Sequence, residues 1–173
     1  MAGSTLYLAQ CAPCARFADY FITSDNQFGF KRNSGCSFAL YTLRSVVDYY
    51  VKYGSTVNIC SIDLSEALND KMDHHALFIQ LMRRNIPALL LKLLETWFDL
   101  GVTCVKWGSY FSEFVKLSCG IGQGGVLSPY LFAVFIDSVV NKIKNSRLGC
   151  YVRHECFSVL LYADDIVLLA PSV

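Results

Sequence analysis

Charged residues are scarce in this sequence. Asp, Glu, Lys and Arg together make up only 17% of the 173 residues, whereas hydrophobic residues make up 54%. A chain with so few charges and so many apolar side chains is neither disordered nor a charged coiled coil. The 15 basic residues nearly balance the 14 acidic ones, for a net charge of +1. This balance argues against a strongly basic protein that coats nucleic acid, although it allows local basic patches.

Long apolar runs and a leader sequence are also missing. The longest candidate, residues 86–94, contains Lys92 and falls short of the roughly 18–20 apolar residues that a membrane-spanning helix needs. The first 16 residues have neither the basic start nor the apolar run of a secretory signal. We therefore expect an intracellular protein, nuclear or cytoplasmic, without a membrane partner.

Eight cysteines are present, and inside a cell we expect them to stay reduced, as small half-buried apolar side chains. Cys11 and Cys14 have the spacing of half a zinc site. No second pair at a suitable distance and no nearby histidine follows, so the sequence disfavours zinc.

Hydrophobic periodicity and turn residues predict helices interleaved with short strands. We expect helices over 34–53, 73–84 and 87–99, and a fourth that Ser128 caps, with Pro129 in its first turn and Gly149 just past its end. A strand is predicted at 57–63, and hairpins at 102–107 with 110–117 and at 157–162 with 166–170. Because the hairpins are local, we predict an α+β fold: a mixed, mainly antiparallel sheet covered by helices on one face.

Asp164 and Asp165 lie at the tip of the last hairpin, between two very apolar strands. Adjacent ionised carboxylates repel in a low-dielectric site, and a bound divalent cation relieves that repulsion. Acids are also common in ordinary hairpin turns, so this pair alone does not establish a site. Asp63 ends the strand at 57–63 and has its own ordinary alternative, the capping of a helix. If that strand lies beside the hairpin, three carboxylates converge and can hold two Mg²⁺ (or Mn²⁺) ions for phosphoryl transfer.

A glycine-rich turn, residues 120–125, precedes the helix at 128. Glycines let a backbone approach a ligand closely, and a helix N-terminus favours anions. The turn lacks the Gly-Lys-Ser/Thr ending of a Walker A loop and the spacing of a dinucleotide-binding fingerprint. On its own it is only a candidate contact for phosphate or sugar.

Four segments follow one another in the order found in reverse transcriptases. They are Asn26-Gln-Phe-Gly with Phe30-Lys-Arg, then Asp63-Leu-Ser-Glu-Ala67, then Gly122-Gln-Gly-Gly-Val-Leu-Ser-Pro129, and finally Tyr162-Ala-Asp-Asp165. From about residue 24 onward the sequence resembles this family, and it is most similar to LINE-type (non-LTR) retrotransposon polymerases. Group II intron maturases are a more distant alternative.

The resemblance implies a polymerase palm whose catalytic metal-binding acids are Asp63 and Asp164, with Asp165 in support. It implies an RNA template, a DNA primer and dNTP as partners. Several further residues would contact nucleotide or template: Gln123, Gly124, Gly125, Lys31, Arg32 and Leu68. For Lys31 and Arg32 the alternative is a solvated loop.

Leu68 departs from the family pattern. A bulky aromatic usually stands at this position, beneath the sugar of the incoming nucleotide. The stretch after it, residues 67–74, also looks one residue longer than in the family. Within that stretch, Asp73-His74-His75 is expected to open a helix rather than to bind metal. Arg83 and Arg84 are expected to form a solvated helix end.

The resemblance also implies a domain organisation. Residues 1–24 remain unassigned, and residues 25–173 are expected to form a partial reverse transcriptase domain with part of the fingers and the palm. A thumb and the remaining fingers would belong to a full-length protein. The alternative is a catalytically inactive truncated remnant, or an RNA-binding module, that retains the palm fold.

Overall fold

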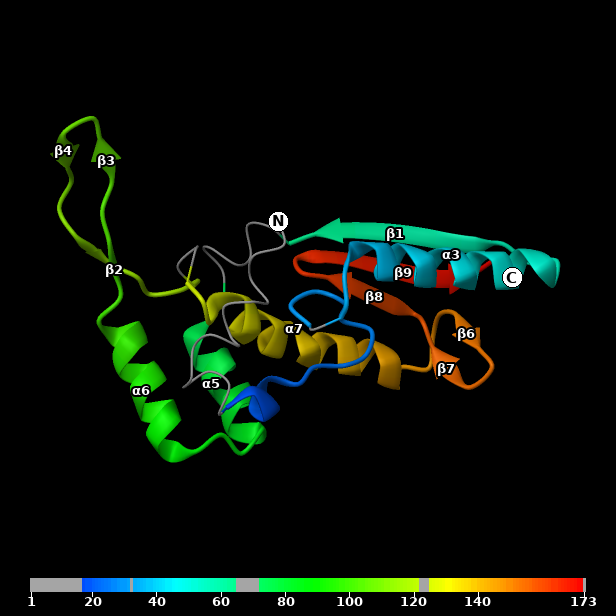
Figure 1. Cartoon of the computed structure of the whole chain (residues 1–173), viewed down its shortest axis with the longest axis horizontal. Coiled ribbons are helices and arrows are strands. Elements are labelled where there is room, and N and C mark those ends of the chain that lie inside the picture. Colours follow the sequence, from blue (N-terminus) through cyan, green and yellow to red (C-terminus); the bar gives the residue numbers. More distant parts are fainter. Residues whose placement is uncertain (1–16, 32, 65–71, 122–124, 173) are drawn as a thin grey trace.

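The computed structural model describes residues 17–31, 33–64, 72–121 and 125–172, and the largest sheet in this part of the chain has three antiparallel strands. Its strands lie in the order β1 (Val57–Asp63), β9 (Asp165–Pro171) and β8 (Val159–Tyr162) (Figure 1). The segments are rich in β-branched and large apolar residues, which suit a pleated sheet. The predicted strand and the predicted hairpin therefore pair with each other, and the α+β fold is confirmed.

Helices cover both faces of the sheet at β8, whereas β1, at the other edge, is largely exposed. On β8, Val159 and Leu161 face a cluster built on α7 (Ser128–Asn145), whereas Leu160 faces a second cluster that contains Val46 of α3 (Cys36–Lys52). Successive side chains of a strand point to opposite faces, so the apolar run at 159–161 requires cover on both. The expectation of helices on one face only is wrong, because α3 returns over the other face.

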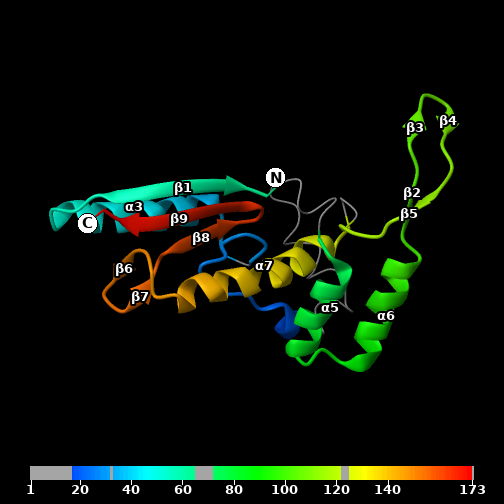
Figure 2. The ribbon, with the colours of Figure 1, turned by 180° about the vertical axis from the view of Figure 1, so that it is seen from behind.

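Two further helices, α5 (His74–Arg83) and α6 (Ala88–Asp99), extend the core beyond α7 (Figure 2). Leu77 and Leu81 of α5 and Leu94 of α6 are buried in the same cluster as α7. The Asp73 carboxylate caps α5 by accepting a hydrogen bond from the backbone N–H of His75 at 2.8 Å. The prediction that this stretch opens a helix is confirmed.

A slender arm projects from the body after α6 (Figure 1). It consists of two short antiparallel pairs, β2 (Val102–Thr103) with β5 (Val115–Lys116) and β3 (Lys106–Trp107) with β4 (Tyr110–Phe111). The predicted hairpin is therefore present, in two pieces. The aromatic side chains at its tip are largely in solvent, with Trp107 82% and Tyr110 81% exposed.

The remaining elements are short: the 3₁₀ helix η1 (Ala18–Phe21) and the hairpin β6 (Tyr151–Val152) with β7 (Glu155–Cys156). Helix α7 begins one residue earlier than predicted, so that Leu127 rather than Ser128 occupies the N-cap position. Pro129 stands in its first turn as expected, because proline suits a position where no backbone donor is needed. Among the described residues, no helix has the length and apolar character needed to cross a membrane.

Candidate active site

The register of the central sheet brings Asp63 directly opposite Asp165. Directly opposed residues of an antiparallel pair lie on the same face, with Cβ atoms about 4.5–5.5 Å apart. One residue further on, the Leu64 N–H donates to the Asp164 carbonyl at 3.0 Å. Strand β1 therefore runs alongside the hairpin to its very tip, and the backbones of the three predicted acids converge at one end of the sheet.

The hairpin turn between β8 and β9 is tight. Tyr162 pairs with Asp165, which leaves only Ala163 and Asp164 in the turn. Ala163 adopts a left-handed conformation with φ +57°, which two-residue hairpin turns favour and which is uncommon for a residue other than glycine. A strained backbone of this kind persists where its surroundings fix it.

A loop from the N-terminal part of the chain supplies those surroundings. The Leu161 N–H donates to the Asn26 carbonyl and the Phe28 N–H donates to the Leu161 carbonyl, both at 2.8 Å. Between them, Gln27 forms a parallel bridge with Leu161. The Asn26 side-chain amide also donates to the Val159 carbonyl at 2.7 Å. Residues 26–28 thus act as a short extra strand along β8.

The same loop also packs closely against the turn between β8 and β9. A Cβ atom built on Gly29 would lie 2.3 Å from the Ala163 backbone nitrogen, so only glycine fits this approach. Gln27 is 1% exposed, and its Oε1 accepts from the Gly29 N–H at 2.9 Å. Its Nε2 atom finds no hydrogen-bond partner in the described part of the chain. Residues 27–29 therefore pack against the turn that carries Asp164.

The three acids suit a divalent cation in their chemistry and their backbone placement. Carboxylate oxygens are preferred ligands of Mg²⁺, and the side chains of Asp63 and Asp165 are exposed to solvent. Within the described ranges, however, no three or more His, Cys, Asp or Glu side chains are positioned together to hold a metal ion. The sheet brings the backbones of the three acids together, and a metal site built from their side chains stays a prediction.

Lys31 does not extend into solvent. Its ammonium group donates to the carbonyls of Thr23 at 3.0 Å and Ser24 at 2.6 Å, and lies 4.0 Å from the Asp25 carboxylate. Burial lowers the pKa of Lys31, while the nearby negative charge of Asp25 raises it in part. The side chain ties the 23–25 segment to the loop that supports the hairpin, and a contact with phosphate stays a prediction.

Most of the predicted nucleotide contacts cannot be compared with the structure, because they lie outside the described residues: Arg32, Leu68, Gln123 and Gly124. Gly125 is described and half-buried, and its carbonyl accepts the Ser128 N–H at 3.3 Å where α7 begins. Gly125 therefore lies immediately before the N-terminus of α7.

The sequence did not predict a largely buried ion pair that joins the end of α5 to α7. The Arg84 guanidinium lies 2.7 Å from the Asp137 carboxylate, with the two side chains 21% and 8% exposed. Arg84 also donates to the Ile22 carbonyl, and Asp137 accepts the Ser24 N–H at 2.8 Å. The expectation of a solvated helix end is therefore wrong for Arg84. The sequence did contain a signal for this pair. Asp137 lies within the apolar stripe of the helix at 128–145, and a buried carboxylate requires a partner.

Comparison with known proteins gives a consistent set of matches. The family described as "Reverse transcriptase (RNA-dependent DNA polymerase)" matches residues 14–172. The Pol polyprotein of the type-2 retrotransposable element R2DM of Drosophila melanogaster is 26% identical over 146 residues, 84% of this chain. Pol polyproteins of type-1 elements R2 are 25% identical over 74% of the chain in Popillia japonica and 26% identical over 66% in Nasonia vitripennis. The chain spans 14%, 22% and 11% of these three polyproteins, respectively.

Proposed function

The chain belongs to the reverse transcriptase family, and from this premise we propose that Asp63, Asp164 and Asp165 are the catalytic acids of an RNA-directed DNA polymerase. The observation that carries the proposal is the pairing of Asp63 with Asp165 across β1 and β9. Like charges directly opposite each other destabilise a sheet, so a fold that keeps them there gains from a bound cation. Residues 25–173 would supply part of the fingers and the palm.

In the proposed reaction, the 3′-hydroxyl of a DNA primer attacks the α-phosphorus of a dNTP and pyrophosphate leaves, with RNA as the template. Asp63 and Asp164 would be the principal ligands of Mg²⁺ or Mn²⁺, and Asp165 would support them. Bound there, divalent ions would stabilise charge on the attacking and leaving oxygens. The role of the carboxylates themselves would be to hold such ions at this end of the sheet.

The support of the hairpin is part of this proposal. Phosphoryl transfer depends mainly on positioning and electrostatic stabilisation, and a small displacement of a ligand is costly. The hydrogen bonds of Asn26 and Phe28 to Leu161, and the contact of Gly29 with Ala163, hold the turn in a single conformation. Residues 26–29 would therefore preorganise Asp164.

The proposal can be tested in a relative that supplies the rest of the polyprotein. Residues 14–172 would replace the matching segment of the R2DM Pol polyprotein, and extension of a DNA primer on an RNA template would be measured. Asp164→Asn should lower the rate more than about 100-fold, because metal-ion stabilisation is worth several kcal/mol. Asp48→Asn, which changes an exposed acid on α3, is the matched control and should extend normally. Unchanged extension by Asp164→Asn would refute the assignment.

One observation favours a second candidate, an inactive palm or RNA-binding module. In the part of the chain that the structure covers, the acids are not already arranged as a metal-ligand group. If this reading holds, the chimera with all three acids intact would bind RNA but fail to extend the primer, while the parent polyprotein extends it.

A further inference from the structure

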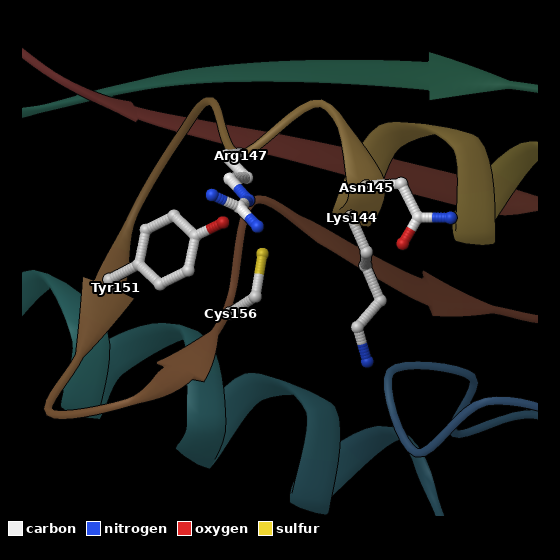
Figure 3. Close-up of a pocket in the computed structure, with 5 residues that line it drawn as sticks. All are labelled: Lys144, Asn145, Arg147, Tyr151 and Cys156. Atoms are coloured by element: carbon white, nitrogen blue, oxygen red, sulfur yellow. The ribbon is translucent and has the colours of Figure 1, made fainter.

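A cavity of about 620 Å³ opens between the C-terminal end of α7 and the hairpin β6–β7. Its lining residues are Lys144, Asn145, Arg147, Tyr151 and Cys156 (Figure 3). The hairpin β6–β7 lies at the opposite end of the sheet from the tip of the β8–β9 hairpin, in both views of the ribbon (Figures 1 and 2). The cavity is broadly open to solvent, and its volume falls within the range of about 300–1,000 Å³ that is common for ligand sites.

The cavity contains a nucleophile with hydrogen-bond donors around it. The Cys156 Sγ atom lies 3.1 Å from the Ser158 Oγ, and the Tyr151 hydroxyl points toward the same sulfur (Figure 3). Burial alone would raise the pKa of Cys156, but hydrogen bonds from Ser158 and Tyr151 and the charge of Lys144 lower it below its usual value. The same contact raises the pKa of Tyr151. These donors favour the thiolate, which is the reactive form of cysteine.

The charge of the cavity is positive. Arg147 and Lys144 are two of its five lining residues, and none of the five is acidic. The Lys144 ammonium is anchored to the Asn26 side-chain carbonyl at 3.1 Å. The Arg147 side chain is exposed and lies above the Tyr151 and Cys156 side chains (Figure 3). A guanidinium in this position offers paired donors to a carboxylate, so the cavity suits an anionic ligand.

We propose that this cavity binds an anionic small-molecule disulfide, such as glutathione disulfide, and that Cys156 exchanges with it to form a mixed disulfide. The Cys156 thiolate attacks one sulfur of the ligand, and its S–S bond breaks as the new one forms. The second half of the ligand leaves as a thiolate and takes a proton from water. The disulfide is the oxidant, so no other reagent is required. Arg147 would hold a carboxylate of the ligand during the attack, while Lys144, whose ammonium is bonded to Asn26 and Ser24, would add positive charge from a greater distance.

The test is the rate of modification at individual cysteines. The chain would be incubated at pH 7 with glutathione disulfide, or with the positively charged disulfide cystamine, and then digested and analysed by mass spectrometry. Cys156 should react with glutathione disulfide at least about tenfold faster than the exposed thiols Cys36 and Cys60. Its preference for the anionic reagent over cystamine should be lost in Arg147→Glu.

The matched control is Arg153→Glu, which makes the same charge change in the turn of the β6–β7 hairpin without lining the cavity. Both arginines are exposed and both adopt a left-handed backbone, with φ +57° and +56°. The control should keep the preference of Cys156 for the anionic disulfide. The proposal is overturned if Cys156 reacts no faster than Cys36, or if both variants keep the preference.

Discussion

Replacing Gly29 with alanine tests how the hairpin that carries Asp164 is held. The new Cβ would lie 2.3 Å from the backbone nitrogen of Ala163 and 2.9 Å from its Cα. Ordinary van der Waals contacts of a Cβ are 3.4–4 Å, so the two backbones have to move apart by about 1 Å. No flexible side chain can absorb this movement, because both contacts are to backbone atoms.

The expected loss follows from what that movement disturbs. The hydrogen bonds of Leu161 with Asn26 and Phe28 lie on the same stretch of loop and would lengthen. Overpacking a well-packed site costs about 1–3 kcal/mol, and a contact between two backbones belongs at the upper end. For a chain of this size, 3 kcal/mol corresponds to a fall in melting temperature of about 6–12 °C. Urea or thermal unfolding, followed by circular dichroism, measures this loss.

Gly35→Ala provides the matched control. Gly35 precedes α3 in the extended conformation, and a Cβ there would meet nothing within 4 Å. We expect this variant to lose at most about 1 kcal/mol. In Gly29→Ala, amide exchange at Leu161 should also accelerate, because its partner Asn26 is displaced. If the two variants are equally stable and Leu161 exchanges at the same rate in both, the loop does not support the hairpin.

Three further results are expected. Arg84→Ala should cost about 2–3 kcal/mol in urea unfolding, because it removes the cation beside the buried Asp137 carboxylate and leaves it with hydrogen bonds from the Ser24 N–H and the Asn141 side chain; wild-type stability would show that the pair is not needed. The chain is expected to self-associate through the exposed aromatic tip of its arm, since exposed aromatic surface drives association, and the double variant Trp107→Ser with Tyr110→Ser should reduce that association in light scattering; an unchanged size distribution would assign association to another surface. In the R2DM chimera, Leu68→Phe should raise the preference for dNTP over rNTP by roughly 10–200-fold; an equal preference would mean that another residue guards the sugar.

Local pattern was sufficient to predict the elements that build the site. The alternation and β-branched residues of 57–63 predicted β1 to the residue, and the apolar runs around Ala163 predicted the last hairpin. The pairing of Asp63 with Asp165 was not predictable from those patterns, since it joins segments that are far apart in the sequence. From the sequence alone we could say only that three carboxylates would converge if the two segments paired.

The support of the hairpin was also beyond sequence reasoning. Residues 26–29 show no alternating pattern, and their pairing with β8 depends on the side-chain amide of Asn26 and on the absence of a side chain at Gly29. The packing of α3 on the second face of the sheet was not predicted, for a related reason. The amphipathic helix at 36–52 indicates that it packs on something, but its pattern does not identify the face.

Binding of Mn²⁺ to the chain itself, measured by calorimetry or by the relaxation of water protons, tests most directly whether the acids act together. Asp63→Asn and Asp164→Asn should each weaken binding at least about tenfold, because ligands on both β1 and the hairpin turn are then needed for one site. Asp48→Asn, on the exposed surface of α3, should bind Mn²⁺ as the unchanged chain does. Equal affinity in all four proteins would contradict a metal site built from Asp63, Asp164 and Asp165.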